Sequence, residues 1–193
     1  AWNFEEYAAF LKSFIDGVSI KDPIIMGQSF GGGVATTYAG LYPEDIPYLV
    51  LIDAVQKGRT PNWYYKLRFN LASLADWIID ARFVPLSFKQ TFLSLHLGAP
   101  QEILSRQNVK QYFVMNDVSR MSRVKTDYSS LRMPVLLVWG ENDTFITPIS
   151  RAREIAEEIP NAELVVIKGG HPALYTNTEK AVWAIANRVL QHP

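Results

Sequence analysis

The feature of this sequence that most constrains its fold is a glycine-rich turn at residues 27–33, which reads Gly-Gln-Ser-Phe-Gly-Gly-Gly. The apolar residues 23–26 before it predict a short strand buried on both faces of a parallel sheet. The small side chains of residues 32–39 predict a helix that packs very close to a strand. A strand that passes through so tight a turn into a helix would expose the side chain of Ser29 at the carboxyl end of the sheet.

Strand and helix patterns alternate over much of the remaining chain. Apolar runs predict further strands at 48–52, 134–139 and 163–167, and helical spacing of apolar residues predicts helices at 4–15, 149–159 and 179–190. Such alternation is typical of right-handed crossovers between parallel strands. The predicted fold class is therefore α/β, with a parallel sheet flanked by helices.

Polar residues mark the expected starts of three helices. Asn3, followed by Glu6 three residues later, predicts the start of the first helix. Thr147 is expected to cap the helix that follows it, and Thr176 and Glu179 have the spacing of a capping box for the last helix.

Residues from about 56 to 131 break the alternation. They contain no convincing strand, several helical apolar patterns and many aromatic side chains, so we expect a helical insertion at 56–131 between core segments at 1–55 and 132–193. Lys and Arg outnumber Asp and Glu in this insertion. A solvated helix face explains that surplus more simply than an anionic substrate or a lipid surface.

Two later loops carry residues that could activate Ser29. A serine hydroxyl needs a base to take its proton and a third group to orient the base. His171 follows the fourth predicted strand and Asp143 follows the third, at the end of the sheet where such folds place their active sites. We therefore predict Ser29 as nucleophile, His171 as base and Asp143 as acid. The backbone N–H of Phe30 is the predicted oxyanion donor.

The glycines of the turn also have a predicted role. Side chains at residues 27 and 31 are both expected to clash in the turn, and the run 31–33 fits close helix packing better than a phosphate cradle. A Gly/Ser turn with only a packing role is the alternative.

Other residues compete for the roles of acid and base. Asp53 follows the second predicted strand and is the rival of Asp143, which could instead serve only to cap the helix after it. His96 lies between two leucines and is expected in the core or pocket of the insertion, whereas His192, next to the terminus, is expected to be solvated. The alternative for His171 is a surface loop residue.

The chain order Ser29, Asp143, His171 and the glycine-rich turn resemble the α/β-hydrolase superfamily, and the insertion resembles its cap domain. Members of that superfamily normally have further strands before the nucleophile strand, so the chain resembles the carboxyl-terminal portion of such a protein. The resemblance implies that an N-terminal segment with a second oxyanion donor is missing. We accordingly expect the chain alone to be weakly active or inactive, with an aggregation-prone edge at the first strand.

The function expected from these residues is hydrolysis of a small or apolar carboxylic ester through an acyl-serine intermediate. Hydrolysis of a C–C bond, a lactone or an amide by the same three residues is the first alternative. A ligand-binding or receptor-like protein without enzymatic activity is the second.

Composition narrows the class of partner. The formal net charge is zero, which argues against nucleic acid, and no apolar run is long enough to cross a bilayer. The absence of cysteine fits a reducing compartment, so a cytoplasmic location is expected. The sequence contains no cluster of metal-ligating residues and no phosphate-binding loop, so neither a metal nor a cofactor is expected.

Overall fold

The computed structural model describes residues 3–55, 78, 81–97, 105, 124–143, 147–171 and 173–190. The chain divides into two compact units, of which the larger comprises Trp2–Lys57 and Arg123–Pro193 and the smaller contains Gly58–Ser122. Residues 124–131 therefore group with the larger unit, and Val124, Tyr128 and Leu131 are buried there. A cap function for the smaller unit stays a prediction.

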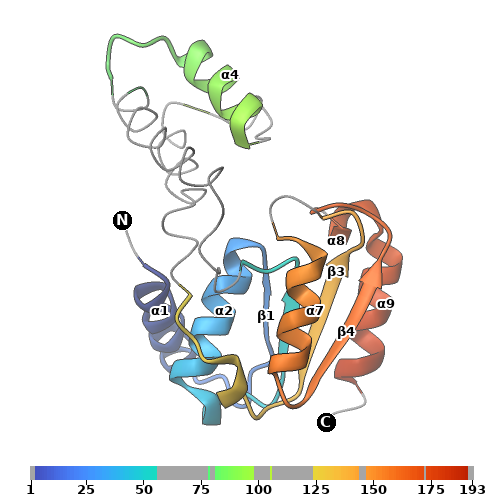
Figure 1. Cartoon of the computed structure of the whole chain (residues 1–193). Helices are drawn as coiled ribbons and strands as arrows, with labels where there is room; N and C mark the ends of the chain where they lie inside the picture. The colour runs from blue at the N-terminus through green and yellow to red at the C-terminus, as the bar shows by residue number, and fades with distance from the viewer. Residues whose placement is uncertain are drawn as a thin grey trace. The chain divides into compact units, whose positions relative to one another are not determined.

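A parallel sheet forms the centre of the larger unit, which agrees with the α/β fold class predicted above (Figure 1). Its four strands lie in the order β1-β2-β3-β4. They are β1 (Ile25–Gln28), β2 (Leu49–Ile52), β3 (Val135–Gly140) and β4 (Ala162–Ile167). Because all four strands run in one direction, the loops that follow them all leave the sheet at its carboxyl end.

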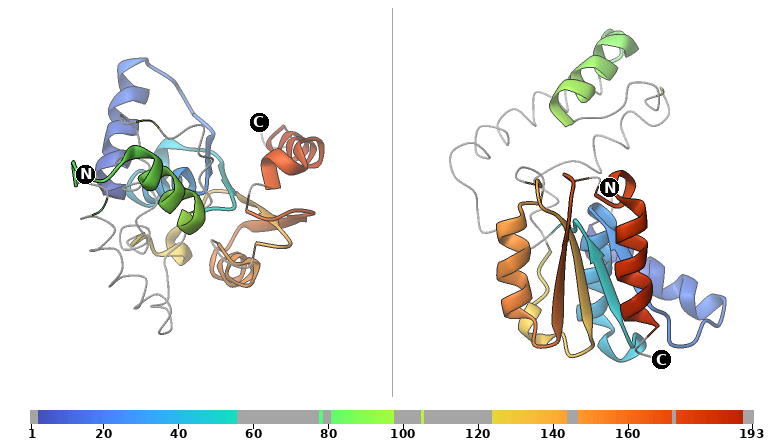
Figure 2. Two further views of the ribbon diagram at one scale, coloured as in Figure 1. Left: turned by 90° about the horizontal axis from the view of Figure 1, so that it is seen from above. Right: turned by 90° about the vertical axis from the view of Figure 1, so that its right-hand side faces the viewer.

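Helices cover the two faces of this sheet. The helices of the unit are α1 (Phe4–Gly17), α2 (Phe30–Leu41), α7 (Ile149–Glu158), α8 (Ala173–Thr176) and α9 (Thr178–Val189), with short 3-10 turns at Pro43–Asp45 and Tyr128–Ser130. Figure 2 shows α9 on the opposite side of the sheet from α7. Alternation along β2 explains the two layers: Leu49 and Leu51 pack with α1, α2 and α7, whereas Val50 and Ile52 pack with α9.

The predicted elements occur with small shifts. Helix α1 begins with the expected capping box between Asn3 and Glu6. Strand β1 starts at Ile25, and the expectation that it is buried on both faces was wrong, because Met26 is 58% exposed. Met26 is level with Val50 on the face that α9 covers over β3 and β4.

Two predicted caps were wrong. Helix α7 has Pro148 as its N-cap, with no side-chain cap, because the Thr147 hydroxyl bonds elsewhere. Helix α9 begins at Thr178 after Asn177, because Thr176 already belongs to α8. No capping box forms at that start.

The smaller unit contains helix α4 (Leu86–Leu97) among its described residues. The remaining expectations for the insertion fall on residues outside those ranges.

Candidate active site

Ser29 occupies the turn between β1 and α2, and its backbone is strained. Its φ of 49° and ψ of −118° lie in a region that side chains disfavour, at a cost of about 1–3 kcal/mol. Hydrogen bonds hold it there: its N–H donates to the Ile52 carbonyl at 3.0 Å, and its carbonyl accepts the Val55 N–H at 2.8 Å. The end of β2 thus fixes the turn that presents the Ser29 hydroxyl.

The two glycines that flank Ser29 differ in their surroundings. A Cβ at Gly27 would lie 2.2 Å from the Gly31 carbonyl oxygen, so no side chain fits. A Cβ at Gly31 would meet nothing within 4 Å, so the expected clash at this position was wrong. Gly32 is crowded instead, because its Cβ would lie 2.3 Å from that of Ala54.

The loops after β3 and β4 bring Asp143 and His171 to the turn. His171 Nε2 lies 2.8 Å from Ser29 Oγ, and His171 Nδ1 lies 2.8 Å from Asp143 Oδ2. Nδ1 therefore donates to the carboxylate, which leaves Nε2 to accept the serine proton in the neutral ring. The structure brings these predicted residues together in the order that proton transfer requires.

The carboxyl of Asp143 is only 2% exposed. Burial by itself would raise its pKa, but hydrogen bonds from His171 and from the hydroxyl and N–H of Thr147 outweigh burial and hold the pKa below its usual value. Asp143 is thus ionised at neutral pH and can stabilise a positively charged His171.

Asp53, the rival acid, has a different place. It is fully buried, and its Oδ1 accepts the Gly140 N–H at 2.8 Å. Its carboxylate therefore joins the end of β2 to the end of β3, whereas the carboxylate that His171 Nδ1 contacts is that of Asp143.

Comparison with known proteins identifies the family. The family model for the alpha/beta hydrolase fold matches residues 1–178. The chain belongs to the alpha/beta hydrolase fold family. Relatives in this family include the AB hydrolase superfamily protein YisY of Bacillus subtilis, 24% identical over 93% of this chain and 70% of its own length.

Other members of the family agree with this assignment. The 2-hydroxy-6-oxononadienedioate/2-hydroxy-6-oxononatrienedioate hydrolase of Paraburkholderia phymatum is 26% identical over 90% of this chain and 64% of its own length. A thermophilic esterase from Thermogutta terrifontis has a similar structure, with a TM-score of 0.71 and 19% identity over 100% of this chain and 74% of the esterase chain. The latter likeness supports the hydrolase fold alone. Strands preceding β1 in a longer protein stay a prediction.

As the first residue of α2, Phe30 has no helix carbonyl to accept its N–H, because the first amides of any helix lack intrahelical partners. This amide follows the Ser29 hydroxyl in the turn, the position from which an oxyanion donor acts. The Phe30 ring packs against the rings of Phe4 and Tyr7, whose centroids lie 5.0 and 5.3 Å from its own. Packing of α1 thus holds the start of α2 in place.

Thr147 is the residue of this site whose role the sequence did not reveal. It is 3% exposed, its N–H donates to Asp143 Oδ1 at 3.1 Å, and its hydroxyl donates to Asp143 Oδ2 at 2.5 Å. Its position just before Pro148 resembled an ordinary helix cap, and no spacing rule distinguishes the two uses.

Two histidines remain besides His171. His96 lies in α4, and His192 lies outside the described residues. Within the described ranges, no cluster of three or more His, Cys, Asp or Glu could hold a metal ion. The helices of that same part of the chain include none long and apolar enough to cross a membrane.

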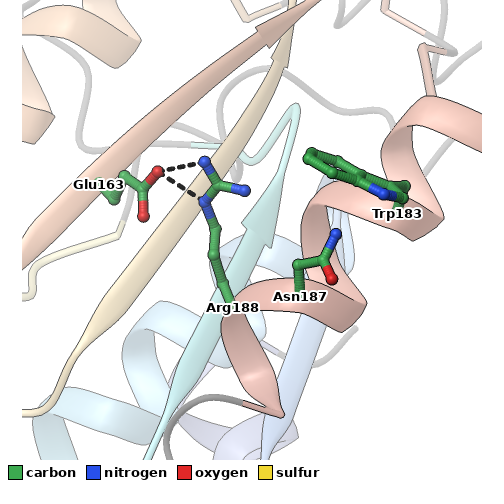
Figure 3. A pocket seen from close by; sticks show the side chains of 4 residues that line it. All are labelled: Glu163, Trp183, Asn187 and Arg188. Carbon is green, nitrogen blue, oxygen red and sulfur yellow. Dashed lines mark hydrogen bonds and ion pairs between the residues drawn. The ribbon is translucent and has the colours of Figure 1, made fainter.

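A pocket of about 480 Å³ lies at a different place, beside α9 and β4 (Figure 3). It is lined by Glu163, Trp183, Asn187 and Arg188. Arg188 is already paired with Glu163, so the pocket offers a ligand no free charge from that cation. None of Ser29, Asp143 and His171 lines it, and we assign the chemistry to their contact rather than to this pocket.

Proposed function

We propose that this protein is a serine hydrolase that cleaves carboxylic esters through an acyl intermediate on Ser29. The observation that carries the proposal is the 2.8 Å contact between Ser29 Oγ and His171 Nε2. This distance is within reach for direct proton transfer from the hydroxyl to the ring. The family's hydrolase-named members support the same class of reaction.

Acylation begins when His171 Nε2 takes the Ser29 proton as Oγ attacks the ester carbonyl. The carbonyl π electrons move to oxygen, and the Phe30 N–H donates to the resulting oxyanion. Asp143 stabilises the imidazolium through Nδ1–H. When the tetrahedral intermediate collapses, the bond to the alkoxy oxygen breaks and His171 returns the proton to the leaving alcohol.

Deacylation repeats these steps with water. His171 Nε2 removes a proton from water as its oxygen attacks the acyl carbonyl, and collapse of the second intermediate breaks the bond to Ser29 Oγ. Ser29 regains its proton from His171, and the carboxylic acid leaves. The net reaction consumes one ester and one water and yields one acid and one alcohol.

Hydrolysis of a C–C bond is the second candidate, and the relatives' names favour it. Both the Paraburkholderia phymatum protein and a Pseudomonas putida protein, 26% identical over 90% of this chain, are named as hydrolases of oxo or semialdehyde compounds, not of esters. The same Ser29, His171 and Asp143 would serve a ketone adjacent to the cleaved bond.

Turnover of two substrate types decides between the candidates. We expect slow hydrolysis of p-nitrophenyl acetate by this chain, in line with the weak activity expected from its sequence, and none by Ser29→Ala or His171→Ala. Faster cleavage of 2-hydroxy-6-oxononadienedioate, the compound in the name of the Paraburkholderia phymatum relative, would favour the C–C reaction if it also depended on Ser29. Equal rates for the protein and Ser29→Ala on both substrates would refute both hydrolase candidates and leave a ligand-binding role.

A further inference from the structure

The Thr147 hydroxyl lies within hydrogen-bonding distance of three groups at once. Its Oγ1 is 2.5 Å from Asp143 Oδ2, 3.2 Å from His171 Nδ1 and 3.2 Å from the carbonyl oxygen of Asp53. A hydroxyl has one hydrogen to donate and two lone pairs that accept. Two of these neighbours, the carboxylate and the carbonyl, compete for that hydrogen.

The charge on Asp143 decides the competition. A carboxylate is a stronger acceptor than a neutral carbonyl and is also the nearer group here, so the Thr147 hydrogen points to Oδ2. The lone pairs of the hydroxyl then face the Nδ1–H of His171. Thr147 thereby donates to the acid and can accept from the base.

The backbone of Thr147 also binds Asp143. Its N–H donates to Oδ1, so one residue binds both carboxylate oxygens and sets the plane of the group. Thr147 is itself fixed, because its carbonyl accepts the indole N–H of Trp139 at 2.7 Å and both residues are buried. The carboxylate therefore faces His171 in one orientation.

We propose that Thr147 is a positioning residue for the hydrolytic reaction, acting through both oxygens of Asp143 to fix the tautomer and direction of His171. This inference rests on the proposed function for the role of His171. It does not rest on Thr147 touching a substrate.

The test compares Thr147→Val, which keeps the branched shape and loses the hydroxyl, with Thr147→Ser, which keeps the hydroxyl. For Thr147→Val we expect kcat on p-nitrophenyl acetate to fall between about tenfold and a hundredfold, the range for a lost hydrogen bond to a charged group, with KM unchanged. Thr147→Ser should restore most of kcat. Wild-type kcat in Thr147→Val, or no recovery in Thr147→Ser, would overturn the proposal.

A second readout does not depend on turnover. The Nδ1 proton of His171 should give a downfield proton NMR signal in the wild type and in Thr147→Ser, and exchange with solvent should broaden it away in Thr147→Val. Persistence of the signal in Thr147→Val overturns the inference even if Ser29 proves inactive, so the two failures are distinguishable. If Thr147→Val does not fold, Thr147→Ser and Thr147→Ala replace the pair, since they differ only in the hydroxyl.

Discussion

Gly140 packs directly on Gly170: a Cβ at residue 140 would lie 2.4 Å from the Gly170 carbonyl oxygen and 2.7 Å from that of Gly169. The Asn142 N–H also donates to the Gly169 carbonyl at 2.9 Å. These contacts join the turn after β3 to the turn after β4. Asp143 and His171 meet because backbone, not side chain, fills the space between their two turns.

This contact predicts that Gly140→Ala disrupts the site. The added methyl would meet backbone atoms that cannot rotate away, so we expect a loss of about 1–3 kcal/mol in the free energy of unfolding. Gly170→Ala is the matched control, because its nearest neighbour is 3.9 Å away. Urea denaturation measures both, and equal stability of the two variants would contradict the proposed packing.

The glycines around Ser29 give a second pair of variants. Gly27→Ala should destabilise the protein by about 1–3 kcal/mol, since the new Cβ would press on the Gly31 backbone. Gly31→Ala should be neutral or stabilising, because it meets open space and alanine favours a helix. Thermal unfolding of both proteins tests this, and a lower Tm for Gly31→Ala than for Gly27→Ala would show that the order is wrong.

The lowered pKa of Asp143 predicts how stability depends on pH. Ionised Asp143 is held better in the folded protein than in the unfolded chain, so its stabilisation is complete above the ordinary Asp pKa of about 3.9. It is lost as the pH falls from there through the lower folded pKa. The difference in unfolding free energy between wild type and Asp143→Asn should thus be constant at neutral pH and shrink in acid; a difference that grows in acid would contradict the assigned direction.

The N-terminal segment from α1 to β1 predicts self-association. Its exposed large apolar residues are Phe10, Phe14, Val18, Ile20, Ile24 and Met26. β1 also lies at an edge of the sheet among the described strands, where backbone groups can pair with another chain. In sedimentation velocity over a concentration series, we expect association that Phe14→Lys with Met26→Lys weakens.

Phe83→Lys is the control for this segment, because Phe83 is 73% exposed in the smaller unit. An equal effect of Phe83→Lys would assign association to general hydrophobicity instead of this edge.

Local patterns were sufficient to predict the sheet. The strand β2 is a continuous apolar run because both of its faces are buried, and residues 49–52 show that burial directly. Met26 is equally apolar and yet exposed, because hydropathy does not record which strand a helix covers. The exposure of this face of β1 depends on tertiary packing, whereas the position of β1 at an edge among the described strands is the one that the resemblance predicts.

Local sequence patterns also predict only part of the candidate site. The grouping of Ser29, Asp143 and His171 could be predicted because each residue follows a strand, and the carboxyl ends of parallel strands lie at the same end of the sheet. The roles of Asp53 and Thr147 could not, since an aspartate after a strand and a threonine before a proline each fit several uses. Only the distances show that Asp53 binds Gly140 and that Thr147 binds Asp143.

The most direct test of the central claim is covalent labelling of Ser29 with a fluorophosphonate, which reacts with activated serine hydroxyls. Intact-mass and peptide analysis should find one adduct, on the peptide containing Ser29, and none in Ser29→Ala. His171→Ala should label much more slowly, because the base that contacts Oγ at 2.8 Å is gone. No labelling of the wild type, or equal labelling of Ser29→Ala, would contradict the assignment of Ser29 as the nucleophile.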